Sequence, residues 1–317
     1  MLHGRAMDQD LVLGRLSYIE VTHAGQAYRH GRYAIHFHIN GNMNGSYVRG
    51  CSIHKSFNRA VNVHNVHELL IEHNVFFNIM GGAMFLEDGI ETRNVFQYNL
   101  GVFVKSSTSL LNDDITPAAY WVTNPDNIIR HNHAAGGTHF GFWYRMHGHP
   151  GGPSFTNSIC PDKVPVGEFY NNTVHSQGWF GIWIFQNYFP TENGACSGRP
   201  VPAKFYSLTS WNNEKGAEWV NCGAIQFIDF VMANNEKAGI EMKMVGGTEW
   251  GEERGALIKD GFMIGHVDAL AETGNTQCTS AGLVLPLSNR QTVSGTDFIN
   301  FDRSGCACLA WASIAGK

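Results

Sequence analysis

A recurring pattern of asparagine, a short turn, a small residue and alternating apolar residues constrains the fold of this chain more than any other feature. Three copies begin with an aromatic–asparagine pair, and their asparagines, Asn58, Asn78 and Asn99, are 20 and 21 residues apart. Looser copies follow as "HNHAAGGTHFGFWYRM", "NNTVHSQGWFGIWIFQ", "WNNEKGAEWV" and "ANNEKAGIEMK". A strand-like repeat of about 20 residues is typical of one coil of a parallel β-helix, which contains three short strands.

The repeat predicts an all-β fold, namely a right-handed parallel β-helix with coils of about 20–23 residues. Asparagine suits the corner of such a coil because it tolerates the left-handed backbone conformation and can hydrogen-bond to the asparagine of the next coil. The alternative is a β-sandwich in which asparagine-rich turns recur by coincidence. We expect a single domain over residues 1–317, with loop insertions at about 106–126, 147–166 and 187–202.

The strand after each turn predicts which side chains face outward. In "AIHFH", "AVNVH", "AMFLE", "GVFVK", "GFWYR", "GIWIF" and "GIEMK" the second and fourth residues are apolar and point inward. The third and fifth residues then form an outward stripe, which contains His36, His38, Asn62, His64, Phe85, Glu87, Phe103, Lys105, Trp143, Arg145, Trp183, Phe185, Glu241 and Lys243.

The aromatic members of the stripe suggest a platform for sugar rings. Phe85, Phe103, Trp143 and Trp183 would stack on the C–H faces of a glycan, while neighbouring polar groups bond to its hydroxyls. The alternative is that the loops at 147–166 and 187–202 fold over this face and bury the rings.

The polar members of the stripe are candidates for chemistry. Cleavage of a polysaccharide needs an acid and a base in one groove, and the candidates are His36, His38, His64, Glu87, Lys105 and Arg145. His36, His38 and Glu87 could also bind a divalent metal, calcium or zinc, although no diagnostic ligand spacing makes any cofactor certain. We expect at least one of the crowded imidazoles to titrate below about 6.5, and Glu87 to raise the pKa of His64.

Composition excludes some partners and indicates a compartment. The net charge is −5 and no run of Lys or Arg occurs, so we expect no nucleic acid partner. No apolar run is long enough to span a membrane, so this segment should make no membrane contact. Cys160 and Cys196 lie in loop-like stretches and are candidates for a disulfide, and Asn44 and Asn171 are in N-glycosylation sequons. Together these features favour an extracellular protein.

Several long segments carry a family resemblance. "GRYAIHFH", "WVTNPDNIIRHNHAAGGTHFGFWYRM" and "NNTVHSQGWFGIWIF" resemble the fibrocystin family of cell-surface proteins, which contain G8 domains and parallel β-helix repeats. More distantly, the first two are similar to the cell-surface hyaluronidases of the same domain plan. The resemblance implies a cell-surface location within a larger chain with neighbouring domains, and it does not by itself imply catalysis.

Two functional hypotheses follow. The first is a non-catalytic module that binds glycan or extracellular matrix, or serves a structural role. The alternative is an endo-acting depolymerase, a hydrolase or lyase of hyaluronan or a related uronan, that is metal-dependent if the histidines hold a cation.

Overall fold

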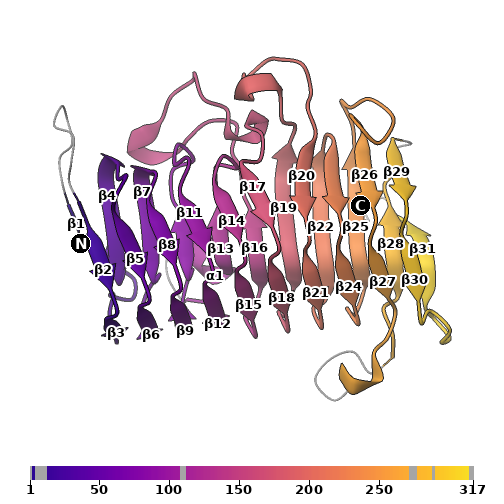
Figure 1. Ribbon diagram of the computed structural model, residues 1–317, viewed down its shortest axis with the longest axis horizontal. Coiled ribbons are helices and arrows are strands. Elements are labelled where there is room, and N and C mark those ends of the chain that lie inside the picture. The colour runs from indigo at the N-terminus through magenta and orange to yellow at the C-terminus, as the bar shows by residue number, and fades with distance from the viewer. Residues whose placement is uncertain (1, 4–12, 108–111, 271–276, 288–289, 314–317) are drawn as a thin grey trace.

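Three parallel β-sheets run the length of the chain and form a parallel β-helix (Figure 1). In this computed structural model, the described residues are 2–3, 13–107, 112–270, 277–287 and 290–313. The N-terminal coils lie at one end of the long axis and the C-terminal coils at the other (Figure 1). The predicted fold class is therefore confirmed.

Each coil contributes one strand to each sheet. Sheet A comprises β1 (Leu2–His3), β4 (Ile35–Asn42), β7 (Val61–His67), β10 (Met84–Leu86), β13 (Ala118–Val122), β16 (Phe140–Tyr144), β19 (Phe180–Tyr188), β22 (Lys215–Cys222), β25 (Ala238–Val245), β28 (Ala281–Leu285) and β31 (Ala307–Trp311). Sheet B comprises β2 (Arg15–Ser17), β5 (Tyr47–Arg49), β8 (Leu70–Glu72), β11 (Val95–Gln97), β14 (Ile128–Arg130), β17 (Glu168–Tyr170), β20 (Ala203–Tyr206), β23 (Ile225–Ile228), β26 (Ala256–Lys259) and β29 (Gln291–Ser294). Sheet C comprises β3 (Glu20–Thr22), β6 (Ser52–Ser56), β9 (Val75–Met80), β12 (Leu100–Lys105), β15 (His133–Ala135), β18 (Thr173–His175), β21 (Thr209–Trp211), β24 (Val231–Ala233), β27 (Phe262–Ile264) and β30 (Asp297–Ile299).

Helical segments in the described chain are short. They are α1 (Asn112–Ile115), η1 (Gly152–Ser154), η2 (Pro161–Lys163), η3 (Glu192–Gly194) and η4 (Asp268–Leu270). None of the helices in the described residues is long and apolar enough to cross a lipid bilayer. The inward apolar residues of all three sheets, such as Phe37, Ile71 and Phe76, are fully buried in one continuous core.

Asparagines stack at the corner between sheets B and C. Asn74 donates its side-chain amide to Asn99, Asn99 to Asn132, and Asn132 to Asn172, over 3.0, 3.0 and 3.2 Å. The residue before each of them has a left-handed backbone, with φ between 50° and 55°. The ladder satisfies backbone groups where the chain turns, because each amide also hydrogen-bonds to a neighbouring coil.

The predicted phase of the repeat was partly wrong. Asn99 belongs to the ladder, but Asn58 bonds to the carbonyls of Gln26 and Arg29, and Asn78 has a left-handed backbone at another corner, within β9. Ladder partners are 25, 33 and 40 residues apart in sequence, because loops of different length interrupt the coils. A constant spacing of 20 and 21 residues therefore aligned different corners of the coil.

The predicted loops agree with the structure at two of three places. Residues 147–166 and 189–202 form long connections on the upper side of the molecule in Figure 1. The predicted insertion at 106–126 is shorter, because residues 118–122 form β13 of sheet A. Cys160 and Cys196 form the predicted disulfide, which joins the two long loops with their Cα atoms 5.2 Å apart. A second disulfide joins Cys278 and Cys306.

Candidate functional site

The outer face of sheet A carries the predicted stripe, and its first coils are in the predicted register. His36 pairs with Asn62 and His38 with His64 across β4 and β7. The row then continues through Phe85, Trp121, Trp143, Trp183, Glu218 and Glu241. These side chains do point outward, because Phe85, Trp121 and Trp143 pack in a cluster separate from the main core.

Two predicted members of the stripe lie elsewhere. Phe103 and Lys105 are in β12, which belongs to sheet C, and the place assigned to them in sheet A is taken by β13 with Trp121. Phe103 is 41% exposed and has a left-handed backbone, so it lies at a corner of the coil. The segment "GVFVK" has the same apolar alternation as a sheet A strand, and sequence pattern alone could not tell the two sheets apart.

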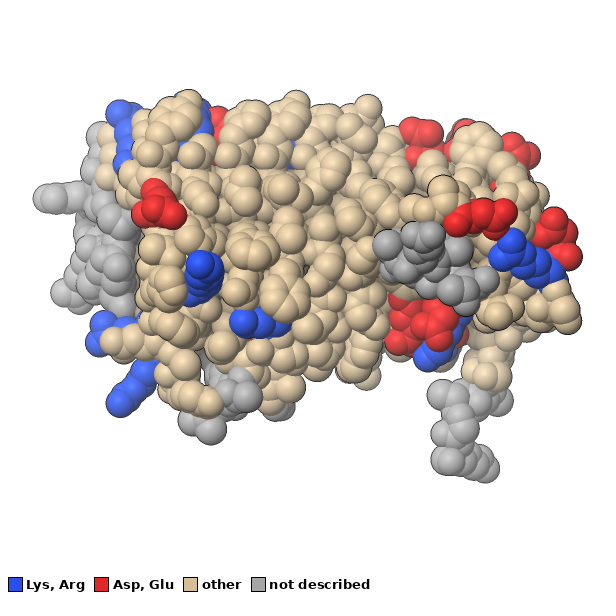
Figure 2. Space-filling model, turned by 90° about the horizontal axis from the view of Figure 1, so that it is seen from below, with Lys and Arg blue, Asp and Glu red and all other residues tan. Residues whose placement is uncertain are grey.

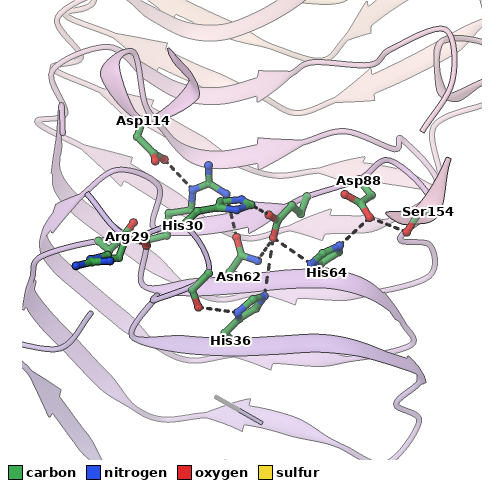
Figure 3. Close-up of polar contacts among 12 residues, drawn as sticks. Arg29, His30, His36, Asn62, His64, Asp88, Asp114 and Ser154 are labelled. Carbon is green, nitrogen blue, oxygen red and sulfur yellow. Dashed lines mark hydrogen bonds and ion pairs between the residues drawn. The ribbon is translucent and has the colours of Figure 1, made fainter. Parts of the chain in front are cut away.

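The histidine cluster consists of His36, His38, His64 and the carboxylate of Glu87. One ring nitrogen from each histidine lies within 4.8 Å of one from each of the others. Glu87 Oε2 is 3.5 Å from His64 Nδ1 and 3.9 Å from His36 Nε2 (Figure 3). The cluster forms because strand stacking brings every coil about 4.8 Å from the next.

Hydrogen bonds fix the ring nitrogens that face this cluster. His36 Nδ1 is 3.1 Å from the carbonyl oxygen of Gly31, so it carries the proton and donates. His64 Nε2 is 2.7 Å from Asp88 Oδ2 and donates in the same way. Asp88 also accepts a hydrogen bond from Ser154 Oγ at 2.6 Å, which ties the loop at 147–166 to the cluster (Figure 3).

Charged neighbours and burial shift the titration of the cluster in opposite directions. Burial lowers the pKa of His36 to about 4, which confirms the expectation that one imidazole titrates low and identifies desolvation as the main cause. Burial also acts against protonation of His64, but the Asp88 hydrogen bond and the Glu87 charge raise its pKa, as predicted for Glu87. Although burial opposes it, the charges of Arg59 and His64 hold the pKa of Glu87 below its ordinary value.

Arg59 is the buried cation beneath the cluster. Its Nε donates to Asp114 Oδ1 at 2.7 Å, and one terminal nitrogen donates to Asn62 Oδ1 at 3.1 Å. Asn62 Nδ2 in turn donates to Glu87 Oε2 at 2.5 Å, so the arginine orients the carboxylate through one intermediate residue. The sequence reasoning missed Arg59, because its position just before a strand gives no sign that it is buried.

The aromatic platform is less accessible than the stripe suggested. Phe85 and Trp143 are only 3% and 6% exposed, because each ring is covered by its neighbours along the row. Trp183 is half-buried and stacks on Phe185 with ring centroids 4.4 Å apart. Trp179, which precedes β19, is 40% exposed and contacts the ring of His139. Trp179 and Trp183 therefore expose more ring surface than the two predicted residues before them.

Arg145 lies away from the histidines. It follows β16, three strands along sheet A from His64, which corresponds to about 14 Å at the usual strand spacing. Its guanidinium carbon is 5.2 Å from the ring centroid of Phe185. Neither Arg145 nor Lys105 is therefore positioned to act on the same bond as His36, His38, His64 and Glu87.

The loop at residues 23–34 borders the histidine cluster on its accessible side. His30 Nε2 is 3.1 Å from Glu87 Oε1, and the Arg29 and Arg32 side chains on the same loop are exposed. A small pocket of about 240 Å³ is lined by Gly25, Gln26, Gly31, Arg32 and Tyr33. A larger pocket of about 620 Å³ lies under the two long loops, between His67, Asp126 and Gly194.

A second ionic group occupies the same face of sheet A further along. The lysine–glutamate cluster consists of Lys215, Glu218, Glu241 and Lys243. Lys215 Nζ forms ion pairs with Glu218 and, at 2.5 Å, with Glu241, while Lys243 pairs with Glu241. Figure 2 shows basic side chains mostly toward the N-terminal end of the lower face and acidic ones mostly toward the C-terminal end.

Both glycosylation sequons lie at the surface, whereas two cysteines lie in the core. Asn44 and Asn171 are exposed, so both sequons are sterically available to a glycan. Asn171 Nδ2 contacts the ring of His131. Cys51 and Cys222 are buried free thiols.

The sequence of this chain is similar to those of several known proteins. The chain is 60% identical over 323 residues to fibrocystin-L of Mus musculus and 58% identical to fibrocystin-L of Homo sapiens, in each case over 100% of the chain. It spans 8% of the length of either relative. It is also 34% identical over 275 residues to cell surface hyaluronidase CEMIP2 of Homo sapiens, which covers 69% of this chain and 20% of that protein.

The match to a defined domain family covers the coils that carry the histidine cluster. The family described as CEMIP beta-helix matches residues 5–182, which include His36, His38, His64 and Glu87. Since this range is more than half of the chain, the protein belongs to the CEMIP β-helix family.

Proposed function

We propose that the N-terminal coils bind an acidic polysaccharide of the hyaluronan type, outside the cell, at the surface formed by the histidine cluster and the loop at 23–34. The observation that carries this proposal is the exposed cationic loop, with Arg29, His30 and Arg32 beside a partly open cluster. A uronate polymer offers regularly spaced carboxylates, which such a loop attracts electrostatically. The relative CEMIP2 is named a cell surface hyaluronidase, which favours this ligand class.

An extracellular location is part of the proposal. The disulfide between Cys160 and Cys196 joins two exposed loops, and disulfides of this kind persist in oxidising compartments. Asn44 and Asn171 would carry N-glycans there. Neighbouring domains of a longer chain would present the module at the surface, since the fibrocystin-L relatives are far longer than this segment.

Aromatic contacts would have a secondary role in binding. Trp179 and Trp183 offer partly exposed rings on the same face, several coils from the cationic loop. A long polysaccharide that follows the face of sheet A would reach both regions. Replacing Trp183 by alanine should therefore weaken binding of long chains more than binding of short oligosaccharides.

Binding is tested with purified chain and high-molecular-weight hyaluronan, and neutral dextran is the control polymer. The double variant Arg29→Ala/Arg32→Ala should bind hyaluronan at least about fivefold more weakly, and the loss should shrink at high salt because exposed charges are screened. Lys204→Ala, at an exposed lysine of β20, is the matched control and should leave binding unchanged. Equal affinity of wild type and double variant would contradict the proposed surface.

Cleavage is a second candidate function, favoured by one specific arrangement. His64 is held between the carboxylates of Asp88 and Glu87, which suits an imidazole that transfers a proton in a polysaccharide-cleaving reaction. Incubation of hyaluronan with the chain, with and without calcium or zinc, tests it by the change in polymer size. Size reduction that is lost in Glu87→Gln would support cleavage, whereas unchanged size in every condition would remove this candidate and leave the binding proposal intact.

A further inference from the structure

The histidine cluster contains a buried ring nitrogen whose lone pair is satisfied by none of the residues that the structure describes. His36 is 2% exposed, and its Nε2 has no hydrogen-bond partner among the residues that the structure describes. Since His36 Nδ1 donates to Gly31, Nε2 carries the lone pair. A buried acceptor without a partner costs free energy, which indicates that a missing group belongs at this position.

His64 directs a second lone pair to the same point. Its Nε2 donates to Asp88, so Nδ1 is the unprotonated nitrogen of the neutral ring. This arrangement of carboxylate, imidazole and inward lone pair is the usual way in which proteins orient a metal-binding histidine. Ser154 holds Asp88 from the far side, which completes the outer support.

Glu87 places a carboxylate oxygen against both nitrogens. Oε2 is 3.5 Å from His64 Nδ1 and 3.9 Å from His36 Nε2 (Figure 3). A carboxylate facing two lone pairs is repulsive unless a proton or a cation lies between them. Arg59, which reaches Glu87 through Asn62, offsets part of this charge, and a proton or a cation among the three groups would offset the rest.

The donor set selects a class of cation. Three imidazoles and one carboxylate are typical of Zn²⁺ and similar borderline transition metals, while calcium and magnesium prefer oxygen ligands alone. Tetrahedral zinc with bonds of about 2.0–2.1 Å places its ligand atoms about 3.3–3.4 Å apart, so the three nitrogens, now within 4.8 Å of one another, would have to move closer by up to about 1.5 Å.

We propose that His36 Nε2, His38, His64 Nδ1 and the Glu87 carboxylate together bind one divalent transition-metal ion, with Zn²⁺ as the natural occupant. This set adds His64 to the three residues that the sequence suggested. The proposal needs no glycan and is therefore independent of the proposed function.

The experiment measures zinc binding by isothermal titration calorimetry on the purified chain after treatment with chelator. We expect one Zn²⁺ per chain and, with Co²⁺, the visible absorption of a four-coordinate ion. His38→Ala and Glu87→Gln should each weaken binding by more than about 100-fold, and Asp88→Asn, which alters only the outer support, by about 10–100-fold. Circular dichroism and thermal unfolding establish which variants remain folded, and Glu87→Gln keeps the shape of the side chain if His38→Ala misfolds.

Two controls separate this site from adventitious binding. Cys308→Ser removes the exposed free thiol, and Glu241→Gln alters a carboxylate of the lysine–glutamate cluster; both should bind zinc as the wild type does. Absence of stoichiometric zinc, or zinc binding that survives both His38→Ala and Glu87→Gln, would overturn the proposal and leave a proton on His64 as the balancing charge.

Discussion

Two charged clusters occupy the same outer face of sheet A, and they neutralise themselves in different ways. In the lysine–glutamate cluster two ammonium groups meet two carboxylates, and Lys215 is the lysine that lies close to both acids, since Lys243 is 4.0 Å from Glu218. In the histidine cluster one carboxylate meets two imidazole lone pairs, and the permanent cation, Arg59, is directed at Asp114. The lysines of the first cluster contact its carboxylates directly, whereas in the second cluster Arg59 reaches Glu87 only through Asn62.

This comparison shows that the stacking of charged side chains does not by itself produce a ligand-binding site. Both clusters arise because identical positions of successive coils lie about 4.8 Å apart, which brings any two outward side chains into contact. Two stacked glutamates, Glu218 and Glu241, with lysines beside them form internal ion pairs. A row of histidines beside one glutamate leaves ring nitrogens directed at one another, and these are the atoms proposed above to bind a metal ion. The aromatic rings between Phe85 and Trp183 separate the two clusters.

The largest expected effect comes from removing the buried cation near the histidines. Arg59 is 2% exposed, and Arg59→Met leaves the Asp114 carboxylate buried without its partner. We expect the free energy of unfolding to fall by about 3–5 kcal/mol, the usual cost of breaking a buried pair. Denaturant unfolding followed by circular dichroism measures it.

The double variant Arg59→Met/Asp114→Asn serves as the control for charge. It should recover part of the loss, because Asp114 no longer leaves a buried charge without its partner. A loss below about 1 kcal/mol in the single variant, as at an exposed ion pair, would show that Arg59 does not act as a buried cation.

A smaller effect is expected at the lysine–glutamate cluster. Lys215→Met should cost about 1–3 kcal/mol, less than Arg59→Met, because Lys243 still contacts Glu241 and lies 4.0 Å from Glu218. Without Lys215 the folded-state pKa values of Glu218 and Glu241 should both rise, because each carboxylate loses a nearby cation. A raised carboxyl pKa adds stability as pH falls through it, so the penalty of the variant should be larger at neutral pH than at pH 4.5, the ordinary pKa of glutamate.

Chemical denaturation of wild type and Lys215→Met at both pH values checks this sign. In the wild type, burial raises the pKa of Glu218, while the two lysines lower that of Glu241 although burial opposes them, so the two shifts partly cancel. A penalty that grows on acidification would contradict the assignment of Lys215 as the shared cation.

The smallest expected effect concerns the contact between the aromatic row and the lysine–glutamate cluster. Trp183 Nε1 donates to Glu218 Oε1 at 3.0 Å, and Trp183→Phe removes this bond while keeping a ring on Phe185. We expect a coupling of about 0.5–1 kcal/mol between Trp183→Phe and Glu218→Gln in a double-mutant cycle of unfolding free energies. Additive effects of the two substitutions would show that the rings and the acids are energetically separate.

The sequence could predict the fold class because its cause is local and repeated. Alternation of apolar residues in "AIHFH" and "AVNVH" marks strands with one buried face, and asparagine marks left-handed corners. The pairing of His36 with Asn62 and of His38 with His64 followed from aligning these neighbouring strands. The disulfide between Cys160 and Cys196 followed from their loop-like surroundings.

The same reasoning failed where the sheets had to be told apart. "GVFVK" alternates like a sheet A strand but belongs to sheet C, so Phe103 and Lys105 were placed on the wrong face. All three sheets bury one face in a common core, and their strands therefore have the same periodicity. Only the lengths of the corners and loops decide which strand stacks on which, and these lengths vary along the chain.

By itself, the sequence determined that this chain forms stacked strands and that polar and aromatic residues share an outward face, because side-chain alternation is a property of each strand. The tertiary structure alone decided that Phe85 and Trp143 are covered while Trp179 is exposed, and that Arg59 lies buried beneath Glu87. It also decided which ring nitrogens of His36 and His64 point inward, since partners from other segments, Gly31 and Asp88, set them. Burial and hydrogen-bond direction depend on neighbours that are distant in sequence, so no local pattern encodes them.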